Sequence, residues 1–367
     1  MTPLRLGLVG CGDIARYVAF IARFDPRIRA VACCDRMLEG AERFATKHRV
    51  PRAYGDVGEM FAEERLDAVY LAVPHDLHLP FVRAGIDAGV HVLVEKPIAR
   101  TLDEGLAIVC RAWAADVCVG VNYQYRYDRA AYALAMAARQ GDLGRIFYAR
   151  CSTPWHRDED YFERSPWHRS LERSGGGTLL TQGSHALDVA LWALDSAPTA
   201  VTGMTGQMRF DDVEVEDLAL GSVELESGAL VQVASSMVAT PERGVTVEIY
   251  GEKGTGVYHS GPVPHVRFHG VRVQKLRPPI WGLHALQRSL AAFAAWVTEG
   301  VPYLTPAEEA LPVLAAIDGI YRAARSGRRE RIEIRELRVF EAVRKPKCPS
   351  SPRQGSHAKT RQSSGVD

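Results

Sequence analysis

A glycine-rich turn directly after the first apolar run constrains the fold of this chain more than any other feature. Residues 4–10 have the pattern of a buried strand, and Gly10, Gly12 and Ala15 follow in the order G-x-G-x-x-A. The first glycine permits a tight bend, the second lets a pyrophosphate approach the backbone, and the small Ala15 lets helix and strand pack closely. A helix expected from Asp13 and Ile14 to about residue 24 offers free N–H groups to the phosphates. The pattern predicts a dinucleotide-binding turn.

An acidic residue stands at the end of the next predicted strand, residues 28–35. Asp35 lies at about the spacing of the carboxylate that binds the adenosine ribose in such sites. Its charge would also repel a 2′-phosphate, which favours NAD as the cofactor. Arg36 follows directly, and a guanidinium there could accept a 2′-phosphate. NADP therefore stays open as the alternative.

Strand and helix patterns keep alternating up to about residue 121. The predicted helices are 38–48, 57–64, 79–88 and 101–115, and the predicted strands are 67–73, 91–94 and 117–122. The helix at 101–115 begins with a capping box, Thr101-Leu-Asp-Glu104. Such βαβ alternation predicts a doubly wound parallel sheet, so we expect a first domain of residues 1–121 with an α/β fold.

The stretch His91-Val-Leu-Val-Glu95-Lys96-Pro97 contains the first candidate for chemistry. Its β-branched apolar run suits a parallel strand buried on both faces, and it stops at an acid, a base and a proline. Ligands of open α/β sheets bind just outside the carboxyl ends of such strands, which makes Lys96 a candidate reacting group. A solvated strand end without function would show the same residues.

The second half of the chain has a different pattern. A helix at 128–140 and a strand from 145 lead into a tryptophan- and charge-rich segment, 155–169; alternating runs at 199–276 predict an antiparallel sheet, and helices follow at 283–298 and 305–326. We therefore expect an α+β domain over residues 122–342. Residues 343–367 are polar, basic and poor in core-forming side chains, which predicts a disordered tail. A passive tail fits this composition better than a nucleic-acid-binding arm.

The predicted helix at 178–194 contains the second candidate for chemistry. Thr181, His185 and Asp188 are spaced by four and three residues, so we expect them on one helical face. A neutral imidazole there could take a hydroxyl proton while hydride leaves the same carbon. A structural histidine that caps a neighbouring carbonyl would have the same sequence. The glycines at 175–177 would let the backbone approach a ligand closely.

Composition narrows the class of partner. The chain has 45 Lys and Arg against 44 Asp and Glu, a net charge of +1, so no overall basic field exists to recruit nucleic acid or an anionic membrane. Its seven cysteines form no C-x-x-C pair, which favours reduced thiols in a cytoplasmic protein. No uncharged apolar stretch is long enough to cross a bilayer. His75 and His78 form an H-x-x-H, but no further ligands stand at typical spacings, so we expect no metal. A small-molecule substrate is expected.

Taken together, the motifs resemble those of the Gfo/Idh/MocA oxidoreductases, the glucose-fructose oxidoreductase and inositol dehydrogenase family. The matching motifs run in order over about residues 3–330: G10-C-G12-D-I-A15, Asp35, P74-H-D-L-H78, A88-G-V-H-V-L-V-E95-K96-P97, 122–126 and G175-G-G-T-L-L-T181-Q-G-S-H185-A-L-D188. The resemblance implies a Rossmann domain and a C-terminal domain with an open, mainly antiparallel sheet, often used to form homo-oligomers, here a dimer or tetramer. It also implies NAD(P)-dependent oxidation of a secondary alcohol on a sugar-like or cyclitol substrate, or reduction of the ketone.

The resemblance also assigns roles to residues. Lys96 and His185 would be the catalytic pair, and Pro97 is often cis in relatives. The residues it suggests for substrate binding are Thr181, Asp188, Arg126 and Trp167. Those suggested for cofactor binding are Gly10, Gly12, Asp13, Ile14, Asp35, Arg36, Pro74, His78, Glu95, Lys96 and Asn122.

One departure from the family pattern bears on function. Many sugar and inositol dehydrogenases of the family have D-x-G-x-H in the His185 helix, whereas this chain has T-Q-G-S-H, with Thr181 at the aspartate position. A proton relay through a carboxylate cannot be assumed there. Two alternatives to a dehydrogenase remain: an NAD-dependent enzyme of the same fold that cleaves glycosides, and a non-catalytic regulator that senses NAD(P).

Overall fold

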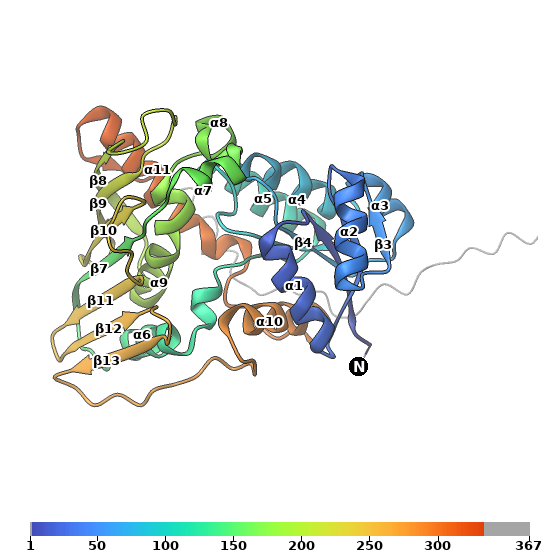
Figure 1. The fold of residues 1–367 in the computed structure, drawn as a ribbon. Coiled ribbons are helices and arrows are strands. Elements are labelled where there is room, and N and C mark those ends of the chain that lie inside the picture. The colour runs from blue at the N-terminus through green and yellow to red at the C-terminus, as the bar shows by residue number, and fades with distance from the viewer. Residues whose placement is uncertain (1, 334–367) are drawn as a thin grey trace, which may run out of the picture.

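The first half of the chain forms a parallel sheet with helices on both faces (Figure 1). The computed structural model describes residues 2–333. The six strands are β1 Leu4–Val9, β2 Ile28–Cys34, β3 Arg52–Tyr54, β4 Ala68–Leu71, β5 His91–Val94 and β6 Val119–Val121, in the order β3-β2-β1-β4-β5-β6. All neighbouring strands are parallel. This strand order is that of a doubly wound dinucleotide-binding sheet, which confirms the predicted fold class.

The helices of this half begin and end close to the predicted positions. They are α1 Asp13–Phe24, α2 Leu38–His48, α3 Val57–Glu63, α4 His78–Asp87 and α5 Leu102–Ala115, with a short 3-10 helix, η1 His75–Leu77. Thr101 accepts a hydrogen bond from the backbone N–H of Glu104 at 3.3 Å, so its side chain caps the start of α5. The Glu104 carboxylate accepts from the N–H of Arg100 at 3.0 Å, where a capping box has the N–H of Thr101. All residues of β4 are buried, because helices cover both faces of the sheet.

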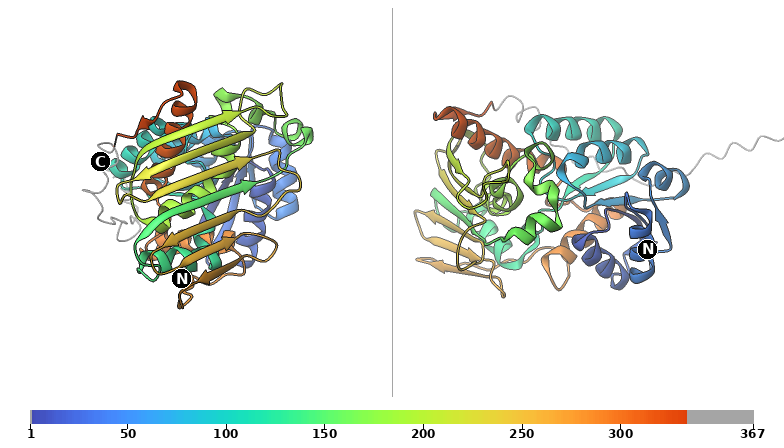
Figure 2. Two further views of the ribbon diagram at one scale, coloured as in Figure 1. Left: turned by 90° about the vertical axis from the view of Figure 1, so that its left-hand side faces the viewer. Right: turned by 45° about the horizontal axis from the view of Figure 1, so that its top comes forward.

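The second half forms an eight-stranded sheet that is mainly antiparallel, as predicted. Its strands are β7 Ile146–Pro154, β8 Pro198–Gly206, β9 Leu218–Leu225, β10 Leu230–Ser236, β11 Thr246–Gly251, β12 Thr255–His259, β13 His265–His269 and β14 Glu330–Arg331, in the order β13-β12-β11-β7-β10-β9-β8-β14. Among the strands that the structure describes, only the β7–β10 pair of this sheet is parallel. The left view of Figure 2 looks onto the outer face of this sheet, where no described helix lies in front of the strands.

The helices of the second half lie between the two sheets or beside them. They are η2 Gln124–Tyr127, α6 Arg129–Arg139, α7 Glu159–Arg164, η3 Pro166–Arg169, α8 Leu171–Ser174, η4 Leu179–Gly183, α9 Ser184–Leu194, α10 Ala285–Glu299, η5 Ala307–Ala310 and α11 Leu311–Ser326. Among residues 2–333 no helix has the length and apolarity needed to cross a bilayer.

The packing joins the two halves more closely than the proposed division at residue 121 suggests. Leu290 and Phe293 of α10 are fully buried and share one core with Leu4, Leu6 and Tyr303. Helix α10 therefore covers one face of the first sheet, although it lies in the second half of the chain (Figure 1). The predicted tail at 343–367, and residues 334–342 of the predicted second domain, lie outside the described residues.

Candidate functional site

The turn after β1 has the geometry of a phosphate-binding turn. Gly10 has φ +86°, and a Cβ there would lie 2.2 Å from the carbonyl oxygen of Ala72, so only glycine fits. A Cβ on Gly12 would meet no atom within 4 Å. Gly12 is also the N-cap of α1 and provides no side-chain cap, so no side chain competes for the N–H groups of the first turn. Asp13 and Ile14 are exposed beside this turn. These residues fit a dinucleotide pyrophosphate.

Asp35 stands at the same edge of the sheet, directly after β2. Its two carboxylate oxygens accept the backbone N–H groups of Cys11, at 3.0 Å, and Met37, at 3.1 Å. A carboxylate has about four acceptor positions, so both oxygens can also accept a ribose hydroxyl. Arg36 is exposed beside it. Pro74 is half-buried and lies three residues after the last residue of β4, Leu71.

His78, a predicted cofactor residue, is held by two backbone contacts. Its side chain is fully buried, with Nδ1 2.8 Å from the carbonyl oxygen of Pro97 and Nε2 3.1 Å from that of Val73. His78 therefore joins the loop after β4 to the loop after β5. Nδ1 of His75 lies 2.7 Å from the carbonyl oxygen of Ser174, so this histidine also contacts backbone. Among the described residues no three His, Cys, Asp or Glu side chains are grouped as a metal site.

Asn122, another predicted cofactor residue, is also buried. Its Nδ2 donates to Oε1 of Glu95 at 2.8 Å and to the hydroxyl of Tyr70 at 2.9 Å, while its Oδ1 accepts from Oγ of Ser289 at 2.8 Å. No part of Asn122 reaches solvent. Glu95 also accepts a hydrogen bond from Tyr70. These contacts hold the end of β5 against β6 and α10, so Glu95 and Asn122 position the neighbouring Lys96.

Lys96 connects the first sheet with the helix at Thr181. Its Nζ donates to the backbone carbonyl oxygen of Thr181 at 2.5 Å. Burial lowers the pKa of the Lys96 ammonium, and the charge of Glu95 opposes this shift. The Lys96–Pro97 peptide bond is cis, as the resemblance implied. Lys96 thus lies where the carboxyl end of β5 meets the second half of the chain.

The helix that contains His185 is not regular, contrary to the prediction. Residues Leu179–Gly183 form a π-helix, and the α-helix α9 begins only at Ser184. A Cβ on Gly183 would lie 2.8 Å from Cβ of Ser235, so glycine permits the helix to lie against β10. Oγ1 of Thr181 donates to the carbonyl oxygen of Gly177 at 2.7 Å. Such wide turns often occur at functional sites, and here the turn places the Thr181 carbonyl at Lys96.

The three glycines at 175–177 face protein, whereas we had expected them to face a ligand. A Cβ on Gly177 would lie 1.9 Å from the carbonyl oxygen of Glu216, and one on Gly176 would lie 2.3 Å from the hydroxyl of Tyr321. The close approach lets the Glu216 carboxylate bind the start of the helix. It accepts the N–H groups of Gly177 at 2.8 Å and Leu179 at 2.9 Å, and the Tyr321 hydroxyl at 2.9 Å. Burial raises the pKa of Glu216, and these hydrogen bonds oppose the shift.

His185 has the environment of a neutral base. Its side chain is 5% exposed and stacks on Tyr125, with ring centroids 4.7 Å apart and an interplanar angle of 22°. Nδ1 has no hydrogen-bond partner among the described residues. Burial lowers the pKa of His185 well below its usual value, and the charge of Lys96 lowers it further. The imidazole is therefore neutral at pH 7, as proton abstraction requires.

Aromatic side chains of the 155–169 segment stack on one another and on the first half of the chain. The Tyr161 ring stacks on His168, with ring centroids 4.5 Å apart. Burial lowers the pKa of His168 to about 4. The half-buried Trp167 meets His75 edge to face at 4.7 Å. The sequence singled out this segment, but Tyr161 and His168 were not among the predicted site residues.

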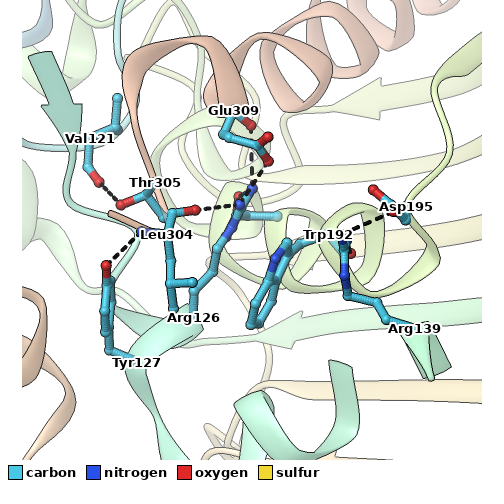
Figure 3. Close-up of polar contacts among 10 residues, drawn as sticks. Val121, Arg126, Tyr127, Arg139, Trp192, Asp195, Leu304, Thr305 and Glu309 are labelled. Carbon is cyan, nitrogen blue, oxygen red and sulfur yellow. Dashed lines mark hydrogen bonds and ion pairs between the residues drawn. The ribbon is translucent and has the colours of Figure 1, made fainter. Parts of the chain in front are cut away.

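Arg126 and Asp188, both predicted to bind the substrate, form an ion pair with each other. Their side chains are 2% and 0% exposed. Nη2 and Nε of Arg126 lie 2.8 and 3.0 Å from the two carboxylate oxygens of Asp188. Nη1 donates to the carbonyl oxygen of Leu304 at 2.8 Å and to Glu309 at 3.1 Å, as Figure 3 shows. This buried pair joins η2 to α9 and to the segment before α11.

Comparison with known families gives two matches along the chain. Residues 4–123 match the family described as "Oxidoreductase family, NAD-binding Rossmann fold". Residues 133–257 match the family described as "GFO/IDH/MocA C-terminal domain". The first match covers the whole first sheet, and the second covers the second sheet from β7 into β12.

Individual relatives are similar over most of their length. The chain is 27% identical to the 1,5-anhydro-D-fructose reductase of Ensifer adhaerens over 334 residues, which cover 90% of this chain and 98% of the relative. It is 29% identical to the D-xylose 1-dehydrogenase (NADP(+)) 2 of Haloferax volcanii over 341 residues, which cover 88% of this chain and 98% of that relative. Among solved structures, the chain is similar to the WlbA dehydrogenase from Bordetella pertussis, crystallised in complex with NADH and UDP-GlcNAcA. The TM-score is 0.78 at 26% identity, and the match covers 90% of this chain and 99% of that one.

The matches agree with the strand order of the first sheet, the glycine turn and the mainly antiparallel second sheet. Both a cofactor domain and the domain that accompanies it in this family are present. The chain therefore belongs to the Gfo/Idh/MocA family of oxidoreductases and has the NAD-binding domain of that family.

Proposed function

We propose that the protein is an NAD(P)-dependent dehydrogenase that oxidises a secondary alcohol of a sugar-like or cyclitol substrate, or reduces the corresponding ketone. The observation that carries this proposal is the bond from Nζ of Lys96 to the backbone of Thr181, four residues before the neutral His185. Through this bond the Lys96 ammonium, at the carboxyl end of β5, contacts the helix that contains the buried base His185. The reductase from Ensifer adhaerens and the dehydrogenase from Haloferax volcanii support a sugar-like substrate.

Lys96 has donors left for a substrate. Its ammonium has three N–H groups, and the Thr181 carbonyl takes one of them. The others can bind the substrate oxygen and stabilise negative charge as it develops there. Bound NAD(P) would accept or supply the hydride. Gly10, Gly12 and Asp35 would hold its pyrophosphate and adenosine ribose.

His185 would take the proton of the substrate hydroxyl. Its lowered pKa keeps it unprotonated at neutral pH, which the oxidation direction requires. The hydroxyl of Thr181 donates to the carbonyl of Gly177, and it is not a carboxylate that could relay a proton. The base role therefore rests on His185, and Thr181 contributes its backbone oxygen to Lys96.

The test is turnover by matched variants. Wild type, K96M and H185Q are incubated with NAD⁺ or NADP⁺ and a panel of sugars and polyols, and NADH or NADPH formation is followed by absorbance. K253M, in the exposed turn between β11 and β12, and H269Q, at an exposed position of β13, are the controls. We expect both site variants to lose at least about 100-fold in kcat/KM, the usual contribution of a general acid or base. They should still bind NADH, as measured by fluorescence.

Two results would contradict the proposal. Wild-type turnover by K96M on a genuine substrate would remove Lys96 from the chemistry. Product formation without any net NADH would favour the glycoside-cleaving alternative, because a cofactor that is reduced and reoxidised in each cycle does not accumulate as NADH.

We further propose that the protein is a homo-oligomer that pairs through the outer face of its second sheet. Tyr148, Leu220 and Leu230 are 39%, 46% and 51% exposed on neighbouring strands of that sheet. Apolar side chains grouped in this way on a sheet without a covering helix are typical of an interface. Light scattering after chromatography should give a dimer or tetramer, and L230D should lower the mass to that of one chain. An unchanged mass would place the interface elsewhere.

A further inference from the structure

Tyr125 lies against the face of the His185 ring, although it was not among the predicted site residues. The two rings stack with centroids 4.7 Å apart and an interplanar angle of 22°. Tyr123 approaches the same imidazole edge to face, with centroids 6.1 Å apart and an interplanar angle of 85°. Two aromatic side chains, one from η2 and one from the residue before it, therefore set the plane of the His185 ring.

This stack takes the place of the hydrogen bond that usually orients a histidine base. In most such histidines one ring nitrogen donates to a carbonyl or a carboxylate, which fixes the tautomer and the orientation of the ring. Nδ1 of His185 has no hydrogen-bond partner among residues 2–333, although the side chain is only 5% exposed. The last torsion of a histidine side chain is soft, so the contact with Tyr125 is what limits rotation of the imidazole.

The position of Tyr125 is itself fixed by its neighbours. Arg126 follows it in η2 and forms the buried ion pair with Asp188, which lies three residues after His185 in α9. The ion pair and the ring stack are thus consecutive contacts between the same two helices. Tyr258 of β12 also meets the Tyr125 ring, with centroids 6.2 Å apart and an interplanar angle of 69°. These contacts hold the tyrosine ring against the base.

The surroundings of His185 disfavour its protonated form. Burial and the charge of Lys96 both lower the pKa of the imidazole. Titratable or charged groups that contact His185, its helix or the turn before it include Lys96, Tyr123, Tyr125, Arg126, Cys151 and Asp188. Burial raises the pKa of the tyrosines and the cysteine, so they stay neutral at neutral pH, and the arginine and aspartate bind each other. The face of the Tyr125 ring has negative partial charge and lies directly on the imidazole.

We propose that Tyr125 is a positioning residue for the base: its ring holds the plane of the His185 imidazole and stabilises the imidazolium that forms during alcohol oxidation. This role rests on the proposed function, because it needs His185 to act as the base. In that step the substrate O–H bond breaks and its proton moves to the unprotonated ring nitrogen. The hydride on the same carbon moves to NAD(P)⁺, and the alcohol becomes a ketone. A cation over the face of a tyrosine ring is stabilised, and more strongly where water is excluded.

The test measures kcat and KM on a substrate that wild type oxidises, at saturating NAD⁺ or NADP⁺, for wild type, Y125F, Y125M and H185Q. Y125M removes the ring, whereas Y125F keeps the ring and removes the hydroxyl. We expect Y125M to lower kcat by about 5- to 30-fold with little change in KM, because a desolvated cation–π contact is worth up to about 30-fold and the transition state has part of the imidazolium charge. Y125F should keep the wild-type kcat. Y132M is the matched control, because Tyr132 packs on Trp192 near the other end of α9, with centroids 5.8 Å apart.

A second comparison separates the charge distribution of the ring from its packing. Phenylalanine and a trifluorinated phenylalanine at position 125 differ little in shape, but fluorine withdraws negative charge from the ring face. The fluorinated ring should give a lower kcat than Y125F and should move the acid limb of the kcat profile to lower pH. The sign follows from His185: a ring that stabilises the imidazolium less lowers the pKa of the imidazole further, so the base stays unprotonated at lower pH.

Three results would overturn this role for Tyr125. One is a wild-type kcat for Y125M, another is an equal loss of kcat in Y132M, and the third is the same kcat for phenylalanine and its fluorinated form. If Y125M does not fold, the two phenylalanine rings decide, since they preserve the packing. Wild-type turnover by H185Q would instead contradict the proposed base. An inactive H185Q beside a fully active Y125M would contradict the role of Tyr125 alone.

Discussion

Replacing Gly177 with alanine tests the packing that holds the start of the His185 helix. An alanine Cβ there would lie 1.9 Å from the carbonyl oxygen of Glu216, whereas ordinary contacts begin at 3.4 Å. The two backbones would have to separate by about 1.5 Å. Three hydrogen bonds cross this contact: Glu216 accepts from the N–H groups of Gly177 at 2.8 Å, Leu179 at 2.9 Å and Thr178 at 3.0 Å.

A separation of this size lengthens all three bonds beyond hydrogen-bond distance. Two of them involve a carboxylate and are each worth about 1.5 to 3 kcal/mol, and the neutral one is worth about 1 kcal/mol. We therefore expect G177A to lower the free energy of unfolding by about 4 to 7 kcal/mol, a large part of the 5 to 15 kcal/mol typical of a folded domain. Turnover should fall as well, because the helix that positions His185 loses its anchor.

Urea denaturation followed by tryptophan fluorescence measures this change. G40A in α2 is the matched control, because its nearest neighbour, Cβ of Met37, lies at an ordinary 3.6 Å. That variant should be stabilised by about 0.5 to 1 kcal/mol, since glycine inside a helix costs backbone entropy. If G177A unfolded within 1 kcal/mol of wild type, roughly the error of such a measurement, the backbones could part without losing these bonds and the reasoning would be refuted.

Three further predictions follow from other contacts. R126M should lower the free energy of unfolding by about 3 to 5 kcal/mol, because Asp188 would stay buried without its cation, whereas R126M/D188L should recover most of the loss in urea denaturation. The free energy of unfolding of wild type should fall by about 3 kcal/mol from His168 alone as the pH drops from 6.5 to about 4. The folded pKa of His168 is about 4, so the unfolded chain binds the proton first; a chemical-denaturation series with H168N should show a flatter profile. Finally, D35S should weaken NADH binding and strengthen NADPH binding by about tenfold each, the effect of one hydrogen bond to a charged group; an unchanged ratio of the two Kd values would contradict the ribose contact.

Much of the first sheet could be predicted from the sequence, because its signals are local. Helix α2, Leu38–His48, has the predicted ends, and the side chain of Thr101 caps α5 as predicted. Strand β3, Arg52–Tyr54, was not predicted: it has three residues, of which only Tyr54 is buried, too few to show alternation. The π-helix at Leu179–Gly183 also left no local signal, because its side chains are buried all round.

The candidate site was harder to predict, because sequence gives the position of a side chain along the chain but not its partners. Asn122 and His78 do lie at the cofactor edge of the sheet, yet both are fully buried and bind other parts of the protein. Arg126 and Asp188 were predicted as substrate contacts, but their spacing did not show that they form an ion pair with each other. Glu216 reaches the start of the His185 helix from 37 residues away, and no spacing rule connects such distant positions.

The bond between Lys96 and Thr181 has an evolutionary consequence. Lys96 contacts a backbone carbonyl, and every amino acid provides one at position 181. Mutation can therefore change the side chain at 181 without removing the anchor of the lysine. The identity of that side chain can drift among descendants of one ancestral enzyme, so position 181 is a natural first site for a mutant library aimed at new substrates.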